Sequence, residues 1–253
     1  MVARLLVCAL IIGCGGKKKP AGEDATRAAR DATIATPDTA GSGAGSAATG
    51  DAAVRVEWKA VPTTARQSPG RTACNTARAP AVSPTTLWGI PDALVLTDKA
   101  PAPTEARIVL ADCALVPRLA IASTLLIVSA VDRPARLTLT KHGTTAKLAA
   151  LQPAEPRAIQ LPIAGHAVSL ELEPNGVYRL AIDAPDGEAA WIVNAPGAVT
   201  DAAGVATLRL PVGTHDVTAW LPARGGRDAR LVTSKLTVDD KQLAELALDL
   251  GSR

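Results

Sequence analysis

Short runs in which apolar and polar residues alternate follow one another along most of the chain. Residues 168–172 alternate in this way, residues 174–176 read Pro-Asn-Gly, and residues 177–182 resume the alternation. Two alternating runs joined by such a turn predict a β-hairpin with one apolar face. Similar runs lie at 137–139, 217–221 and 244–250. Together with 19 Pro and no long helical stripe, this pattern predicts an all-β chain folded as a β-sandwich.

The first fourteen residues follow a different pattern. Arg4 precedes an apolar stretch over 5–12, which closes on Gly13 and Cys14. This arrangement is typical of an export signal, and the stretch is too short to span a bilayer. The closing Ile-Ile-Gly-Cys resembles the lipobox of bacterial lipoproteins. The resemblance implies that residues 1–14 form a lipoprotein signal peptide and that Cys14 becomes the acylated N-terminus after cleavage. An ordinary secretory peptide and an intracellular apolar N-terminus are the alternatives.

Lipidation implies that the partner of the N-terminus is a membrane and that the protein is exported to the cell envelope. Gly15, rather than Asp, follows the cysteine, which by analogy with enteric bacteria favours the outer membrane, with the protein facing the periplasm. Residues 15–53 consist mainly of Ala, Gly, Ser, Thr, Asp and Lys, which cannot bury a core. We therefore expect a flexible, disordered tether that reaches about 35 Å from the membrane.

Composition limits what the folded part can do. Hydrophobic residues make up 47% of the chain, but aromatic residues only 2%, and the only Met is the initiator. The core must therefore consist of aliphatic side chains. The formal net charge of +3 is spread along the sequence, whereas binding to single-stranded nucleic acid needs stacked aromatics on a basic groove. Nucleic acid is not an expected partner.

Four cysteines are present. Cys8 leaves with the signal and Cys14 is the lipid site, so Cys74 and Cys113 remain as a pair in an oxidising compartment. We predict a disulfide between them, which would stabilise the fold by about 4 kcal/mol in the chain-entropy model. The alternative is metal binding, for which no further Cys and no nearby His would complete a tetrahedral set.

A family resemblance adds detail. Its first part rests on Asp112, Cys113, Pro117, Leu125, Ile127, Asp132, Gly176, Val177, Tyr178, Asp183, Ala190 and Trp191. Its second part rests on Val199, Thr200, Asp201, Gly204, Leu208, Leu210, Pro211, Gly213, Thr214 and Trp220. These residues resemble plastocyanin-like cupredoxins followed by a carboxypeptidase-regulatory-like, or transthyretin-like, segment. The resemblance implies Greek-key β-sandwich architecture, with a cupredoxin-like region over 54–195 and a transthyretin-like segment over 196–253.

The copper ligands of that family are missing here. One ligand position falls at Ala135 or Arg136, and the downstream metal loop reads Ile-Asp-Ala-Pro-Asp-Gly-Glu over 182–188. Ile and Pro cannot bind a metal, and a carboxylate alone does not suit a blue-copper centre. We therefore expect neither a metal nor any other cofactor, and interpret the chain as a cupredoxin-type scaffold without its copper.

Few other residues suggest a site. Asp183, Asp186 and Glu188 replace the metal loop and form a possible ligand-facing loop, either as a calcium site or as a solvated turn. Trp88, before a Gly-Ile-Pro turn, is either a surface platform for a glycan or peptide or a core residue, and Trp58 is equally uncertain. Trp191 and Trp220 are predicted to be buried.

The three histidines lie far apart in the sequence. His215 occupies the position of the usual Tyr of the regulatory-like motif and is expected to fill space behind a turn, and its neighbour Asp216 would point to the opposite face of a strand. No catalytic motif is present, so we do not expect an enzyme. The sequence favours a membrane-tethered binding or structural module with a protein or glycan partner in the envelope. The alternative is an atypical copper-handling protein that recruits His142 and His166.

Overall fold

The alternating runs of the sequence form strands, and the described chain is mostly β, as predicted. The computed structural model describes residues 48–72, 74–183 and 188–251. Its elements are β1 (Thr49–Glu57), α1 (Thr63–Arg66), β2 (Leu94–Leu96), β3 (Glu105–Ala111), β4 (Ala114–Val116), β5 (Leu119–Ile121), β6 (Thr124–Ser129), β7 (Ala135–Thr144), η1 (Thr145–Ala150), β8 (Pro156–Leu161), β9 (Ala167–Glu171), β10 (Gly176–Ile182), β11 (Ala189–Val193), β12 (Gly197–Val199), β13 (Val205–Pro211), β14 (Gly213–Leu221), β15 (Arg230–Val238) and β16 (Ala244–Asp249). The signal peptide, Cys14 and nearly all of the predicted tether lie outside the described residues.

Strands β9 and β10 form where the sequence predicts them, but the predicted hairpin between them is wrong. β9 pairs with β6 in one sheet, and β10 pairs with β7 and β11 in another. Both strands turn their apolar side chains, among them Leu170 and Leu180, into the same core. Alternation fixes only which face of each strand is buried, so it cannot distinguish a hairpin within one sheet from an arch between two sheets.

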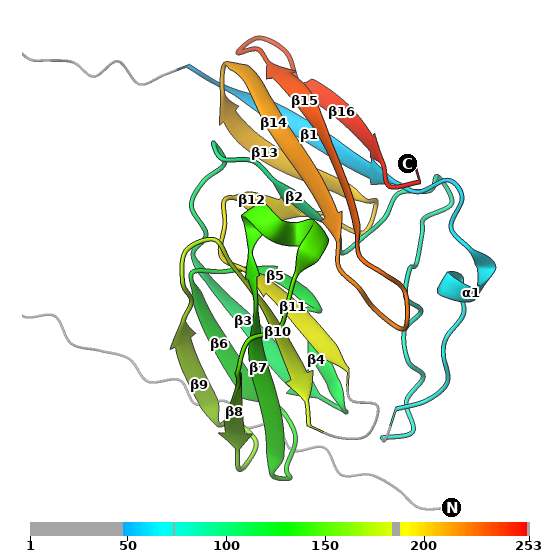
Figure 1. Ribbon diagram of the computed structural model, residues 1–253, viewed down its shortest axis with the longest axis vertical. Coiled ribbons are helices and arrows are strands. Elements are labelled where there is room, and N and C mark those ends of the chain that lie inside the picture. Colours follow the sequence, from blue (N-terminus) through cyan, green and yellow to red (C-terminus); the bar gives the residue numbers. More distant parts are fainter. Residues whose placement is uncertain (1–47, 73, 184–187, 252–253) are drawn as a thin grey trace, which may run out of the picture. The chain divides into compact units, whose positions relative to one another are not determined.

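Strands β3 to β11 build one half of the described chain, here called the central half. They form a sheet of order β5-β11-β10-β7-β8 and a second sheet of order β4-β3-β6-β9, both of mixed parallel and antiparallel pairing (Figure 1). One aliphatic core receives side chains from both sheets, for example Ile127 from β6 and Leu137 from β7. The core therefore consists of branched aliphatic residues, as the composition requires.

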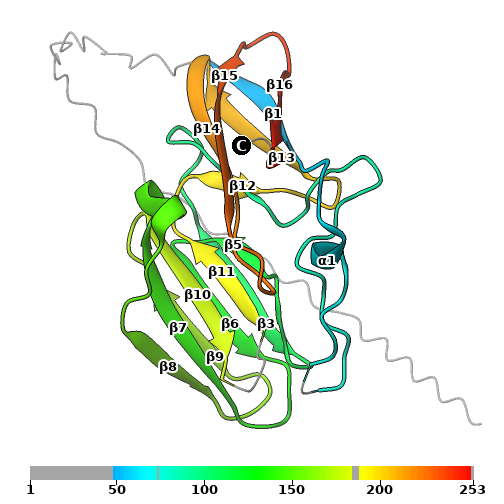
Figure 2. The same ribbon diagram turned by 45° about the vertical axis from the view of Figure 1, so that its right-hand side comes forward.

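The remaining strands build the terminal half, in which the two ends of the described chain meet. β1 pairs antiparallel with β13 and parallel with β16, and β2 lies between β12 and β14 (Figure 2). β1 begins at Thr49, inside the segment predicted to be a tether, and its pairings cross the predicted boundary at residue 195. Val54 and Val56 of β1 are fully buried in the core that the C-terminal strands share.

A third core joins the two halves. It contains Leu94 and Trp220 from the terminal half and Val177 and Trp191 from the central half. Both tryptophans are buried, as the sequence predicts. The described residues include no helix that is long and apolar enough to cross a membrane.

The turn between β12 and β13 explains why its sequence contains Thr, Asp and Gly at fixed positions. The buried hydroxyl of Thr200 donates to the Ile90 carbonyl at 2.8 Å and accepts from the Ala93 amide at 2.9 Å. The Asp201 carboxylate accepts from the Val205 amide at 3.0 Å. Gly204 has φ +81°, and a Cβ at this position would lie 2.4 Å from the Ile90 nitrogen. Only glycine fits both the conformation and the space.

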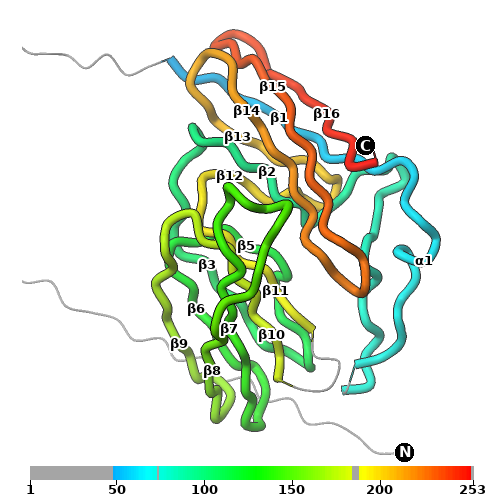
Figure 3. Tube along the Cα trace, viewed as in Figure 1, coloured from blue at the N-terminus to red at the C-terminus, as the bar shows by residue number. Residues whose placement is uncertain are grey.

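The predicted disulfide between Cys74 and Cys113 is confirmed. Cys113 lies in the turn between β3 and β4, and Cys74 lies in the long irregular segment that leaves β1 and returns at β2. Figure 3 shows this segment, which carries α1, running beside the strands. Arg133 donates to the sulfur atoms of both cysteines, at 2.5 Å and 2.9 Å. The disulfide therefore fastens the irregular segment to the central half.

Candidate functional site

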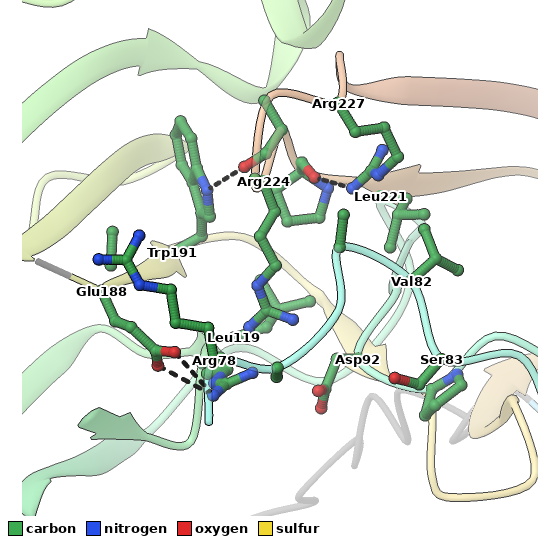
Figure 4. A pocket seen from close by; sticks show the side chains of 18 of the residues that line it. Arg78, Val82, Ser83, Asp92, Leu119, Glu188, Trp191, Leu221, Arg224 and Arg227 are labelled. Atoms are coloured by element: carbon green, nitrogen blue, oxygen red, sulfur yellow. Dashed lines mark hydrogen bonds and ion pairs between the residues drawn. The ribbon is translucent and has the colours of Figure 1, made fainter. Parts of the chain in front are cut away.

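A cavity of about 230 Å³ lies where the irregular segment, the start of β11 and the loop between β14 and β15 come together (Figure 4). Its apolar wall includes five large side chains from distant parts of the sequence. These are Val82, Ile90, Leu119, Trp191 and Leu221. The cavity is smaller than the roughly 300–1,000 Å³ that enclose drug-sized ligands, so its volume suits a molecule of metabolite size.

The charged residues around the cavity are mostly arginines. Five arginines line it, together with two carboxylates. The arginines are Arg78, Arg118, Arg179, Arg224 and Arg227, and the carboxylates are Asp92 and Glu188. Positive charge that is spread along the sequence is thus gathered in space, and the lining has an excess of three positive charges.

Among the arginines of the cavity, Arg118 is held by a carboxylate, that of Glu188. Its Nη2 lies 2.9 Å from Oε2 and 3.2 Å from Oε1 of Glu188, and both side chains are largely buried, at 22% and 14% exposed. Parallel pairing of β5 with β11 fixes this geometry, since the Trp191 amide donates to the Arg118 carbonyl. Figure 4 shows the two dashed contacts at the Glu188 carboxylate.

The loop between β14 and β15 supplies Arg224 and Arg227. These two residues exchange backbone hydrogen bonds of 3.0 Å and 2.9 Å across Gly225 and Gly226, whose φ values are +55° and +77°. Positive φ at both central residues is the requirement of a two-residue type I′ hairpin turn, which Gly-Gly satisfies. The Trp191 indole N–H donates to the Ala223 carbonyl at 3.2 Å and so attaches the loop to the central half.

Burial and neighbouring positive charges disfavour the charged guanidinium groups of this loop. Burial, followed by the neighbouring charges of Arg224 and Arg230, lowers the pKa of Arg227 to about 10. Arg227 donates to the Pro222 and Asp228 carbonyls, but its buried Nε has no partner. Burial and then the charge of Arg118 lower the pKa of Arg224. Figure 4 shows the Arg224 side chain extending into the cavity.

The other cavity arginines differ in their contacts. Arg78 donates from Nε to the Arg71 carbonyl at 3.1 Å and so has a partner. Within the described part of the chain, the side chains of Arg179 and Arg224 have no hydrogen-bond or ion-pair partner. An unpaired guanidinium that is partly removed from water is costly. Arg179 and Arg224 are therefore the groups best placed to meet an anion.

The structure separates the residues of the predicted ligand-facing loop. Glu188 lines the cavity, whereas Asp183 is exposed at the end of β10 and forms an ion pair of 3.2 Å with Arg136. Asp186 lies outside the described residues. Trp88 is 38% exposed, with φ +65°, in a turn beside the end of β1. Among the described residues, no three His, Cys, Asp or Glu side chains form a possible metal-binding group.

The three histidines lie in different parts of the structure. His142 is a bulged residue of β7, packs edge to face on Trp191 with ring centroids 5.0 Å apart, and has a pKa lowered first by burial and then by Arg179. His166 follows β8, whose last residue Leu161 pairs with Ala135 at the opposite end of β7. His215 is buried, with Nε2 2.7 Å from the Pro211 carbonyl, in the space-filling position expected of it. Trp58, which the sequence leaves uncertain, is buried.

The arginine cavity is the part of the site that sequence reasoning missed. The one signal in the sequence is the Arg-Gly-Gly-Arg run at 224–227, between two strands. The other three arginines come from separate segments, so no spacing rule brings them together. Comparison with known proteins adds nothing to this picture, because no family model, no curated protein and no solved structure matches the chain.

Proposed function

We propose that this protein is a non-enzymatic binding protein of the cell envelope, anchored through lipid on Cys14, whose cavity receives a small ligand. The observation that carries the proposal is the cavity itself. It combines an apolar wall, including Trp191, with the side chains of Arg179 and Arg224, which have no partner in the described chain. Ligand sites in proteins typically combine an apolar lining with a few polar groups that converge on it.

The chemistry of the lining supports binding rather than catalysis. Among the described residues that line the cavity, Ser83 is the only one with a hydroxyl, and none is His or Cys. Arginine does not give up its proton in proteins, so it cannot act as a general base. Glu188 forms an ion pair of 2.9 Å with Arg118, which makes it a structural partner of that arginine.

We also propose the finer fold that the resemblance implies, a Greek-key cupredoxin-like sandwich followed by a transthyretin-like segment. Two features support it. The Tyr178 hydroxyl accepts a hydrogen bond of 2.9 Å from the Glu173 amide, five residues upstream, and such a tyrosine corner is typical of Greek-key sandwiches. The two sheets of the central half also share one core.

The proposed scaffold has no copper centre. At one position where the resemblance implies a copper ligand, Arg136 forms an exposed ion pair of 3.2 Å with Asp183, and Arg136 has no lone pair to offer a metal. The metal content of protein purified without chelator tests this proposal. We expect less than one tenth of an equivalent of copper, and one equivalent would contradict it.

The anchor is tested by Cys14→Ser in the full chain. We expect the wild type to partition into detergent and to carry the added mass of acyl chains, and the variant to lose both. An unchanged mass and unchanged partitioning would contradict lipidation. A Cys8→Ser variant, which alters only the signal segment, is the matched control and should behave as the wild type.

The cavity is tested by filling it. Ala189 lines the cavity and lies two positions before Trp191 on β11, hence on the same face of the strand. We expect Ala189→Trp to abolish stabilisation by ligands in a thermal-shift panel of small organic acids, bases and neutral compounds. Ser169→Trp, on the exposed face of β9, should respond as the wild type. A panel in which no compound raises the melting temperature of the wild type would contradict a small-molecule site.

A further inference from the structure

We infer that the cavity is selective for a small organic anion, whose carboxylate or phosphate group contacts the guanidinium groups of Arg224 and Arg179 and whose carbon skeleton lies against Trp191 and Leu119. The inference rests on the proposed function, because it names the ligand class of the same cavity. The inference adds that the ligand must be negatively charged, which the size and shape of the cavity alone do not determine.

The first argument is the imbalance of charge. Five arginines face two carboxylates around the cavity, and Glu188 is already held by Arg118 at 2.9 Å. Asp92 is exposed to solvent, where its charge is screened. Asp92 and Glu188 attract Arg224 only from beyond ion-pair distance, and within the described residues neither Arg224 nor Arg179 forms an ion pair with a carboxylate.

The second argument is the free-energy cost of partly burying the guanidinium groups of the loop between β14 and β15 without a bound anion. Burial and the neighbouring Arg118 oppose the charge of Arg224, and Arg224 opposes the charge of Arg227. A bound anion would relieve both effects, because each guanidinium can donate two parallel hydrogen bonds to a carboxylate or phosphate. An uncharged ligand would leave the repulsion in place.

The third argument is that the anion site is held in position. The Gly225-Gly226 turn fixes Arg224 and Arg227 at its two ends, and the Trp191 indole N–H binds the Ala223 carbonyl. Arg179 comes from the middle of β10, which pairs on both sides with β7 and β11. Little ordering is then required on binding, which favours affinity.

The apolar wall makes the ligand organic. Trp191 and Leu119 are buried residues that lie next to the arginines in the cavity lining. An inorganic ion would bury no apolar surface against them, whereas the carbon skeleton of an organic anion would gain free energy from such burial. We therefore expect an organic carboxylate or phosphate ester to bind more tightly than inorganic phosphate.

The experiment is calorimetric titration of the full chain in detergent with phenyl phosphate, benzoate, benzamide and inorganic phosphate. Benzamide has the shape of benzoate without its charge. We expect the two organic anions to bind at least tenfold more tightly than benzamide, and more tightly than inorganic phosphate. Tighter binding of phenyl phosphate than of benzoate would assign a phosphate ester, and the reverse order a carboxylate.

Two variants test whether Arg224 binds the anion. Arg224→Gln should weaken binding of the tighter organic anion at least tenfold, without lowering the melting temperature of the unliganded protein. Arg107→Gln, an exposed residue of β3 that does not line the cavity, is the matched control and should bind as the wild type. Equal binding by Arg224→Gln and the wild type overturns the inference.

The inference and the proposed function fail differently. Benzamide binding as tightly as benzoate, abolished by Ala189→Trp, would overturn the charge requirement and leave a binding site in the cavity. Absence of binding by both organic anions would overturn the inference as well. The proposed function would then be decided by the broader thermal-shift panel.

Discussion

The indole rings of Trp191 and Trp220 meet edge to face, with centroids 5.5 Å apart and planes at 85°. Trp191 belongs to β11 of the central half and Trp220 to β14 of the terminal half. In a chain with so few aromatic residues, this pair lies in the core that joins the two halves. Because Trp191 also lines the cavity, the packing between the halves helps to position the binding wall.

Replacing Trp220 should be costly. Its side chain is 0% exposed, so Trp220→Ala should lower the free energy of unfolding by about 3–5 kcal/mol, through lost burial and the cavity left behind. Trp88→Ala is the matched control, because Trp88 is 38% exposed, and it should cost less than about 1 kcal/mol. Urea denaturation of the two variants measures the difference. Equal losses would mean that Trp220 does not stabilise the junction of the halves.

Replacement by alanine should lower stability by very different amounts at two glycines that share a left-handed backbone conformation. Gly204 and Gly226 have φ +81° and +77°, but only Gly204 has a backbone nitrogen 2.4 Å from the place of a Cβ, whereas Gly226 has open space. Gly226→Ala should cost about 1 kcal/mol for the left-handed conformation. Gly204→Ala should cost about 3 kcal/mol or more, because the turn must also move away from Ile90. Thermal unfolding of both variants separates the cost of the left-handed conformation, which both share, from the cost of the contact with Ile90, which only Gly204→Ala has. Equal losses would mean that the contact with Ile90 costs nothing.

His142 should make stability depend on pH. Burial and Arg179 lower its pKa in the folded protein, so the unfolded chain takes up a proton at a higher pH than the folded chain does. The contribution of this group to stability is therefore complete above the unfolded pKa of about 6.5 and decreases as pH falls below that value. His142→Gln should show a smaller loss of stability between pH 7 and pH 5. An NMR titration in which the His142 ring titrates above 6.5 would contradict this prediction.

Removing the charge of Glu188 should have opposite effects on stability and on binding. Glu188→Gln leaves the largely buried Arg118 without its partner, which should lower the free energy of unfolding by about 1–2 kcal/mol. It also removes the carboxylate that competes with a bound anion, so affinity for phenyl phosphate should rise about threefold to tenfold.

The control for Glu188→Gln is Asp183→Asn. Asp183 and its partner Arg136 are 51% and 58% exposed, and exposed ion pairs are worth about 0–1 kcal/mol. We expect this variant to change neither stability beyond about 0.5 kcal/mol nor affinity for phenyl phosphate. Weaker binding by Glu188→Gln would mean that Glu188 contacts the ligand directly.

The sequence predicts local features of this fold better than its connections. Alternation locates β7, β9, β10, β14 and β16, and cysteine counting identifies the Cys74–Cys113 disulfide. Alternation does not say which strands pair, and so it predicts a hairpin where β9 and β10 in fact form an arch between two sheets. It also does not show that β1, in a stretch with the composition of a tether, lies between β13 and β16. Four small or apolar residues of β1, Ala52, Ala53, Val54 and Val56, form a strand because β13 and β16 pair with them on both sides.

The site was harder to predict than the fold for a physical reason. Coulomb interaction depends on distance in space, and residues such as Arg118 and Arg224 are far apart in sequence but line one cavity. The sequence predicts Glu188 as a site residue from its position in a loop, and Glu188 does line the cavity, as the partner of Arg118. The same reasoning predicts Asp183, which lies elsewhere, in a pair with Arg136.

The Cys74–Cys113 disulfide makes one wall of the cavity depend on a covalent bond that forms by oxidation. Cys74 lies in the same irregular segment as Arg78 and Val82, which line the cavity, so this covalent bond holds one wall of the binding site against the central half. In a compartment that keeps thiols reduced, a newly made chain would lack that fastening. Under the proposed export and ligand binding, capture of the ligand would then begin only after oxidation of this pair of cysteines.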